Sequence, residues 1–494
     1  MKTATFVALG DGLTAGAGDF GMSEELQPFS FPAQVARRLT TPFPQPEIEA
    51  PGIGPVIGFA DLPVRLPQPL QTTVLKEFPP AGLYANVSIP GLKLIDALTR
   101  RPASPLIHRS DGLQTTINLV LGLPGLLMPG NALLPTAVEY ALFRRPTLAL
   151  IALGYHDVID AAMKGDAAWI PDDVSFRMNY DSVLAPFGRV PATIVASTLP
   201  DPADTALFTP VSAAARVVKA EVAVLSALFG LDETDSLTPS GLIEIGCRLM
   251  TRTSGALPEG SVVPASVVAR ISERVASLNS QIRALAQEQD ALVLDLHTLF
   301  ARVKRDGVTV GDRRLTADYL GGFYSLNGVY PGATGHGVIA NELLRVLNTA
   351  CGTSYLPIDL SELIAPDPVT QYRLAPGPVL TMGDVTARPA RRSDRASATA
   401  TLAAATEMPA RTRITLPHSL EATVALNAES SYFGDALRAA HTTFERDIPF
   451  GSTPNTLFGG LCLTQSHLSG HVTFRFTPPK DDITQFTMSL GEGL

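Results

Sequence analysis

The sequence predicts an α/β protein, in which helices cover both faces of a parallel sheet and a β-rich domain follows. Three observations predict this fold: short apolar runs recur along the first 300 or so residues, helical patterns separate them, and period-two alternation begins after about residue 365. The chain has 494 residues, of which 45% are hydrophobic and 17% charged. That length is more than one hydrophobic core usually holds, so we expect two domains, residues 1–365 and 366–494.

Four runs of apolar and β-branched residues are predicted to be buried strands, at residues 4–9, 148–153, 192–197 and 291–296. Helical patterns lie between them. The clearest places an apolar stripe on one helix face, formed by Ile271, Val275, Leu278, Ile282 and Leu285, and another helix is expected from about Gly337 to Ala350. The alternation predicts a parallel sheet with a ligand site beyond the carboxyl ends of its strands.

Two stretches interrupt this alternation and are predicted to be insertions. Residues 40–86 are rich in proline, so we expect irregular structure there. Residues 108–140 are densely apolar without a clean period. They fit either a hydrophobic flap over the carboxyl edge of the sheet or ordinary core helices broken by Pro124 and Pro129, and the sequence does not distinguish the two.

Composition excludes several classes of function. A net charge of -9 and a pI near 5.4 argue against a nucleic-acid partner. Three widely spaced cysteines, Cys247, Cys351 and Cys462, do not form a zinc-binding pattern, and we expect neither a metal nor a cofactor. The most apolar stretch, residues 119–128, is too short to cross a bilayer. The chain enters a strand-like run directly after Met1 and Lys2, so the default expectation is a cytoplasmic protein, and the alternative is an exported one whose signal peptide is missing from this sequence.

The first predicted strand runs into Gly10-Asp11-Gly12-Leu13, which resembles block I of the SGNH (GDSL-type) hydrolases. In that family the block reads Gly-Asp-Ser-Leu, and the serine attacks an ester carbonyl. Gly12 stands in the place of the serine and has no side chain that could attack.

Later segments match the family in order. Asn86-Val87-Ser88-Ile89-Pro90-Gly91 resembles block II, in which a glycine N–H helps to form the oxyanion hole, and Gly91 is retained. Leu153-Gly154-Tyr155-His156-Asp157 resembles block III, Gly-x-Asn-Asp, with His156 in place of the asparagine that supplies another oxyanion donor.

The last block of the family reads Asp-x-x-His-Pro, and the matching stretch is Asn327-Gly328-Val329-Tyr330-Pro331. Asn327 therefore replaces the orienting acid and Tyr330 the general base, while His336 matches a downstream histidine that is not catalytic. The resemblance covers about residues 1–350. It implies a flavodoxin-like sheet and says nothing about residues 366–494.

The replaced side chains favour a pseudoenzyme. The phenol of an unperturbed tyrosine has a pKa of about 10, so Tyr330 would be a poor base, and Asn327 could not stabilise a positive partner as a carboxylate does. Loss of the nucleophile alone costs on the order of 10⁶ in rate in a serine protease. The alternative is an ester hydrolase with an unconventional active site that uses His156.

Two other classes of protein fit less well. Gly10-Asp11-Gly12-Leu13-Thr14-Ala15 matches a dinucleotide-binding fingerprint, but no acidic residue falls between Glu25 and Glu47, where the ribose partner is expected. No Gly-x-Ser-x-Gly elbow offers another nucleophile. We therefore expect a site that binds a small acyl-like or anionic group, such as a fatty acid or a lipid-like ester. Gly12, Gly91 and His156 would be its hydrogen-bond donors, and residues 119–128 would cover its tail.

Overall fold

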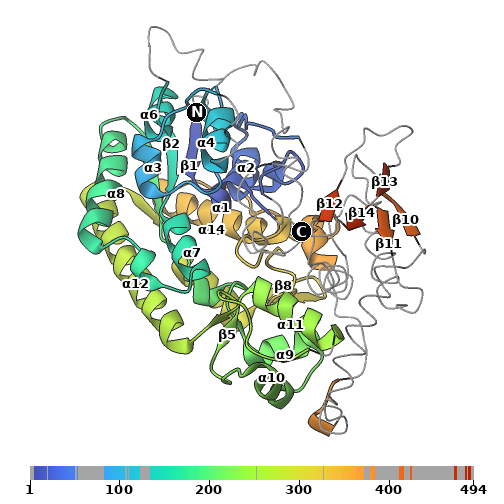
Figure 1. The fold of residues 1–494 in the computed structure, drawn as a ribbon. Coiled ribbons are helices and arrows are strands. Elements are labelled where there is room, and N and C mark those ends of the chain that lie inside the picture. Colours follow the sequence, from blue (N-terminus) through green and yellow to red (C-terminus); the bar gives the residue numbers. More distant parts are fainter. Residues whose placement is uncertain are drawn as a thin grey trace. The chain divides into compact units, whose positions relative to one another are not determined.

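Four parallel strands form the main sheet of the structure, a computed structural model of the chain. They are β1 (Phe6–Gly10), β2 (Leu148–Ala152), β3 (Thr193–Ser197) and β7 (Leu292–Leu294), in that order across the sheet. The strands overlap all four predicted runs, and helices separate them along the chain. The prediction of a mixed α/β fold with a parallel sheet is confirmed (Figure 1).

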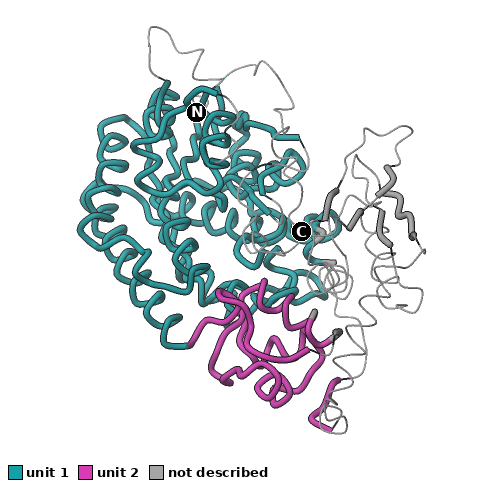
Figure 2. Tube along the Cα trace, in the orientation of Figure 1, with its two compact units in different colours: residues 1–57, 70–208, 265–370 teal, residues 58–69, 209–264, 371–494 magenta. Residues whose placement is uncertain are grey.

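The structure describes residues 5–18, 21–49, 53, 83–105, 108, 111–122, 134–251, 253–325, 327–371 and 379–383, and five short strands between residues 411 and 490. The chain divides into two compact units (Figure 2). The first comprises residues 1–57, 70–208 and 265–370, and it contains the parallel sheet. The second comprises residues 58–69, 209–264 and 371–494.

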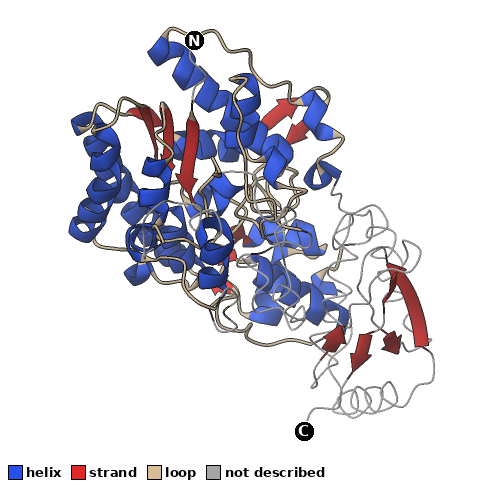
Figure 3. Cartoon of the chain, turned by 90° about the horizontal axis from the view of Figure 1, so that it is seen from above, coloured by secondary structure: helices blue, strands red, loops and turns tan. Residues whose placement is uncertain are grey.

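Helices cover both faces of the parallel sheet. Successive side chains of a strand point to opposite faces, and every residue of β1 and of β2 is buried, so neither face is open to solvent. Figure 3 shows helices on both sides of these strands. Gly10 of β1 is paired with Ala152 of β2, and Ser197 of β3 with Leu294 of β7. The strands therefore end together at one carboxyl edge.

A further extended segment lies beside β1 on the edge opposite to β2. Ala8 N donates to Ala85 O at 2.9 Å, Val87 N donates to Ala8 O at 2.8 Å, and Ile89 N donates to Gly10 O at 3.1 Å. The bridge between Ala8 and Asn86 is parallel. This segment thus extends the sheet by one short strand and brings residues 86–91 to the carboxyl end of β1.

The helices of the first unit follow from amphipathic patterns. The apolar stripe predicted between Ile271 and Leu285 lies on α12 (Ala265–Glu288), and all five of its residues are buried. The helix expected from Gly337 to Ala350 is α14 (Ala333–Cys351), which begins earlier. The remaining α-helices are α1 (Gly12–Ala15), α2 (Phe31–Arg38), α3 (Leu94–Thr99), α4 (Gly112–Ile117), α6 (Ala137–Phe143), α7 (Tyr155–Met163), α8 (Asp173–Gly188), α13 (Leu296–Asp306) and α15 (Ser361–Ile364).

Shorter elements complete this unit. They are the 3₁₀ turns η1 (Gln27–Phe29), η4 (Ala167–Trp169), η5 (Pro202–Asp204) and η6 (Pro368–Gln371), the π-helical turn η3 (Asn118–Gly122), and the hairpin of β8 (Val308–Val310) with β9 (Arg313–Leu315).

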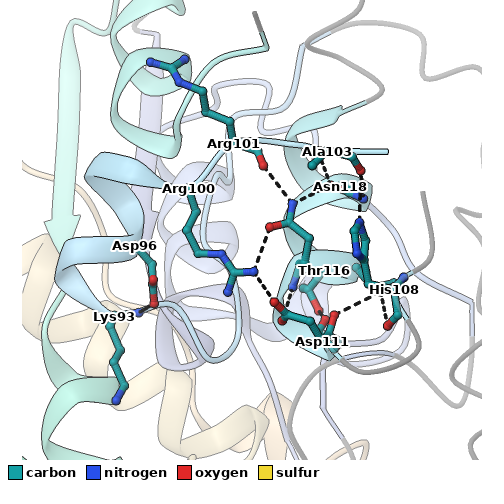
Figure 4. Close-up of polar contacts among 12 residues, drawn as sticks. Lys93, Asp96, Arg100, Arg101, Ala103, His108, Asp111, Thr116 and Asn118 are labelled. Carbon is teal, nitrogen blue, oxygen red and sulfur yellow. Dashed lines mark hydrogen bonds and ion pairs between the residues drawn. The ribbon is translucent and has the colours of Figure 1, made fainter. Parts of the chain in front are cut away.

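A polar network fixes the described part of the 108–140 stretch (Figure 4). The Arg100 guanidinium donates to the Asp111 carboxylate and to Gln114 Oε1. Gln114 Nε2 donates to Asn118 Oδ1 at 2.9 Å, and Asn118 Nδ2 donates to Ala103 O at 2.7 Å. Gln114 and Asn118 are both buried. The described residues of this stretch are thus built as helices around buried side chains, and residues 123–133, with Pro124 and Pro129, lie outside the described part.

The predicted irregular insertion is described only in part. Residues 40–49 contain neither a helix nor a strand, as expected, and most of residues 50–82 lie outside the described residues.

In the C-terminal region the expected alternation coincides with β12 (Val472–Phe474) and β14 (Met488–Leu490), which pair antiparallel. β10 (Arg411–Leu416) pairs antiparallel with β11 (Thr423–Ala425) and with β13 (Thr484–Phe486). The β-rich domain as a whole stays a prediction.

Residues 209–264 of the second unit form three helices with short strands. The helices are α9 (Val211–Val218), α10 (Val222–Phe229) and α11 (Pro239–Thr251). The strands β4 (Thr209–Pro210), β5 (Ser236–Leu237) and β6 (Val262–Val263) form a small antiparallel sheet. Within the described ranges, no helix of the chain combines the length and the apolar character needed to cross a membrane.

Candidate functional site

The sequence-predicted residues lie at or near the carboxyl edge of the parallel sheet. Gly12 is the first residue of α1, directly after β1, and His156 is the second residue of α7, after β2. Asn327 and Tyr330 lie in the loop that leads into α14. Gly91 follows the extended segment beside β1 in a turn with φ of 87°, a backbone conformation that favours glycine. No described hydrogen bond joins Gly91 to the other four residues.

Asp11 joins the first two of these segments, although the sequence analysis gave it no role. Its Oδ1 accepts a hydrogen bond from Leu13 N at 3.1 Å, and its Oδ2 accepts one from His156 N at 2.8 Å. The carboxylate therefore caps the N-termini of both α1 and α7, where negative charge is favourable. Asp11 is completely buried, and this burial raises its pKa to about 7.

Tyr330 packs against Gly12. An ideal Cβ placed on Gly12 would lie 2.3 Å from Tyr330 Oη and 2.5 Å from Tyr330 Cζ, far inside van der Waals contact. The space that any side chain at position 12 would need is therefore filled by the phenol of Tyr330. The side chain of Tyr330 is buried, which raises its pKa well above 10, so the hydroxyl keeps its proton.

Asn327 holds the loop of Tyr330 in place. Its Oδ1 accepts hydrogen bonds from Val329 N at 2.8 Å and from Tyr330 N at 2.9 Å. Its Nδ2 donates to Gly18 O at 2.8 Å, which ties the loop to the segment after α1. All three described bonds are to backbone groups, so Asn327 acts as a positioning residue for Tyr330.

His156 is a neutral side chain at the start of α7. Its pKa is lowered to about 4, and burial is the largest cause. The charge of Asp160 opposes this shift, and the charges of Lys93 and Lys164 add to it. Its Nδ1 is buried and has no hydrogen-bond partner in the described part of the chain. A neutral imidazole can donate or accept one hydrogen bond at each nitrogen, depending on its tautomer.

Tyr155, the neighbour of His156, was also missed by the sequence analysis. Its side chain is 3% exposed, and its hydroxyl has no partner among the described residues. Burial raises its pKa well above 10, and the charges of Asp11, Asp201 and Asp204 raise it further. The resemblance to block III, Gly-x-Asn-Asp, pointed only to His156. Tyr155 falls on the unspecified position of that block, and an aromatic residue at the apolar start of a helix gives no separate signal.

His336 does not belong to this group. It lies on α14, 3% exposed, and its ring stacks on Phe31 with centroids 6.3 Å apart. Neither ring nitrogen has a described partner, and burial lowers the pKa to about 3. That this histidine is not catalytic stays a prediction.

The group contains no evident site for a metal ion. Across the described residues, no three histidine, cysteine, aspartate or glutamate side chains are arranged to share a metal ion. The arrangement offers instead phenol hydroxyls, an imidazole and backbone N–H groups, all of which are able to donate hydrogen bonds.

Comparison with known proteins found no match to the chain, either among protein families or among curated protein sequences.

Proposed function

We propose that this chain is an SGNH-hydrolase-like protein that has lost ester hydrolysis and retains a site for a small acyl or lipid-like ligand. The motif order supports the family assignment, and so does the sheet. Numbered along the chain, the extended segment 85–89 is second and the sheet order becomes 2-1-3-4-5, which is the flavodoxin-like order. In such sheets ligands bind at the carboxyl edge where the strand order reverses, which here is beside β1.

One observation gives the main support for the proposed loss of ester hydrolysis. Tyr330 fills the space in which a nucleophilic side chain at position 12 would stand, 2.3 Å from the position of its Cβ. A replaced nucleophile alone could reflect a single mutation. Here a tyrosine from another block packs where the side chain of residue 12 would stand, so this arrangement has no room for the family's nucleophile.

The remaining residues support the same conclusion. A general base must accept a proton near neutral pH, and a phenol with a pKa above 10 does not. All the described hydrogen bonds of the Asn327 side chain are with backbone groups, so this side chain does not orient a general base. His156 has a pKa of about 4, which makes it a weak base as well.

Ligand binding is supported by the donors that remain. The Gly12 N–H is at the first position of α1, where a helix does not use its own amide groups, and neither it nor the Gly91 N–H donates in any described hydrogen bond. Together with the ring of His156 they are donors available to the polar atoms of a ligand.

The alternative is a hydrolase that uses His156 in a rearranged site. The unpartnered Nδ1 of His156 is the observation in its favour, because a base needs a free nitrogen.

Reaction with a fluorophosphonate probe and hydrolysis of p-nitrophenyl butyrate test the proposal. We expect no labelling and no turnover above a blank. Turnover that survives repurification and disappears in a His156→Ala variant would establish the alternative. A Gly12→Ser variant should stay inactive, whereas Gly12→Ser with Tyr330→His and Asn327→Asp restores the family's three side chains and should gain activity if the family assignment holds.

A further inference from the structure

Two buried tyrosine hydroxyls at the carboxyl edge lack partners. Tyr155 and Tyr330, here called the tyrosine pair, are 3% and 1% exposed, and no described residue forms a hydrogen bond with either hydroxyl. Leaving a buried donor unpaired costs about 1–3 kcal/mol. The pair therefore favours a ligand that offers an acceptor atom to these hydroxyls.

Strand order places carboxyl groups on both sides of Tyr155. Tyr155 follows β2, which lies between β1 and β3 with neighbouring strands about 4.8 Å apart. Asp11 follows β1, while Asp201 and Asp204 follow β3, at the start and the end of η5. We call these three carboxyl groups the acidic rim.

We propose that the tyrosine pair binds the neutral carbonyl oxygen of an uncharged acyl ligand, such as an amide or an ester, and that the acidic rim excludes the corresponding carboxylate ion. This inference rests on the proposed binding function and identifies the charge of its ligand. A phenol donates a stronger hydrogen bond to a carboxylate than to a neutral carbonyl. Selection against the carboxylate therefore comes from the surrounding charges, whose repulsion has to outweigh that difference.

Electrostatics at the tyrosine pair supports this selection. Burial is the largest cause of the raised pKa values of both tyrosines. Beyond burial, Asp11, Asp201 and Asp204 raise the pKa of Tyr155, and Asp11 and Tyr155 raise that of Tyr330. No cation contributes at either hydroxyl among the described residues. An anion placed there would meet the same repulsion that opposes the phenolate, whereas a neutral carbonyl would not.

Calorimetric titration of the full-length protein at pH 8 with hexanamide and with hexanoate tests the inference. These ligands share a tail and differ in charge. We expect hexanamide to bind at least tenfold more tightly than hexanoate. Equal affinities, tighter binding of hexanoate, or no binding of hexanamide would overturn the inference.

Two variants identify the groups responsible. Tyr155→Phe removes one hydroxyl and should weaken hexanamide binding about threefold to tenfold. Tyr180→Phe is the matched control, because Tyr180 is also buried with a hydroxyl that has no described partner, but it lies on α8 and its pKa is raised by burial alone. Equal effects of the two variants would contradict a role for Tyr155.

The acidic rim is tested at Asp204, which is partly exposed and so tolerates substitution more readily than Asp11. Asp204→Asn should strengthen hexanoate binding severalfold and leave hexanamide binding unchanged. An unchanged hexanoate affinity would count against the rim. The two proposals fail in different experiments. Hydrolysis of p-nitrophenyl butyrate would contradict the proposed loss of esterase activity, whatever the affinities for hexanamide and hexanoate are.

Discussion

At the scale of single residues, the contact between Gly12 and Tyr330 gives the first prediction. Gly12→Ser should destabilise the protein by about 1–3 kcal/mol, because the new Cβ would overlap the Tyr330 hydroxyl and force the loop to move. Urea unfolding measures the change. Gly112→Ser is the control, because a Cβ at Gly112 meets no atom within 4 Å, and we expect its effect to stay within about 0.5 kcal/mol.

A double-mutant cycle separates this contact from other effects of a serine. In a Tyr330→His background the smaller ring leaves more room, so Gly12→Ser should cost less than in the parent protein, with a coupling energy above about 0.5 kcal/mol. Strictly additive costs would show that the overlap does not determine the stability of the serine variant.

Asn327 leads to a second prediction at this scale. Asn327→Asp should destabilise the protein by about 1–3 kcal/mol near pH 8, because the variant loses the donor to Gly18 O and sets a carboxylate against that carbonyl oxygen. Burial and repulsion from Gly18 O raise the pKa of the new acid in the folded state, whereas the Val329 and Tyr330 N–H groups, which donate to its other oxygen, lower it. We expect burial and repulsion to prevail, so the penalty should shrink as the pH falls and the acid is protonated. A penalty of constant size between pH 8 and pH 5 would contradict this explanation.

At the scale of elements, periodicity predicted the strands and α12, because these depend on the spacing of apolar residues along a local stretch. The site could be predicted only through its motifs. Gly12 and Tyr330 each gave a family-equivalent position, but their mutual contact depends on how the loop before α14 folds back on β1. The roles of Asp11 and Tyr155 were missed for the same reason. The Asp11 carboxylate accepts a hydrogen bond from His156 N, and the carboxyl groups that act on Tyr155 are those of Asp11, Asp201 and Asp204, all far from these residues in the sequence.

Asn279 on α12 illustrates this limit and gives a third prediction. It is fully buried beside the apolar stripe, where its Oδ1 accepts from Leu199 N at 2.7 Å and its Nδ2 donates to Leu199 O at 2.9 Å. Asn279→Ala would leave two buried backbone groups unpaired, and we expect a loss of about 2–4 kcal/mol. The exposed neighbour Ser280, replaced by alanine, should change the free energy of unfolding by less than about 0.5 kcal/mol.

At the scale of the whole molecule, buried carboxyl groups and buried histidines make the free energy of unfolding depend on pH in opposite directions. Burial raises the pKa of Asp11 to about 7 and those of Asp157 and Asp367 to about 6. The folded state therefore holds these protons more tightly than the unfolded state, and stability falls as the pH rises from about 4 to 7. His156 and His336 act in the opposite sense, because their pKa values are lowered to about 4 and about 3.

A His336→Leu variant isolates one of these contributions. Between pH 6.5 and pH 3 the unfolded chain binds a proton at His336 that the folded chain does not, so the parent loses stability as the pH falls through this window. The variant lacks that loss. Its free energy of unfolding should be close to that of the parent at pH 7.5, since both ring nitrogens are unpartnered among the described residues, and should exceed it by about 1–3 kcal/mol at pH 4.5. Urea unfolding at the two pH values measures the difference. A difference that does not change with pH would contradict the lowered pKa, because it would mean that His336 binds its proton equally in the folded and unfolded states.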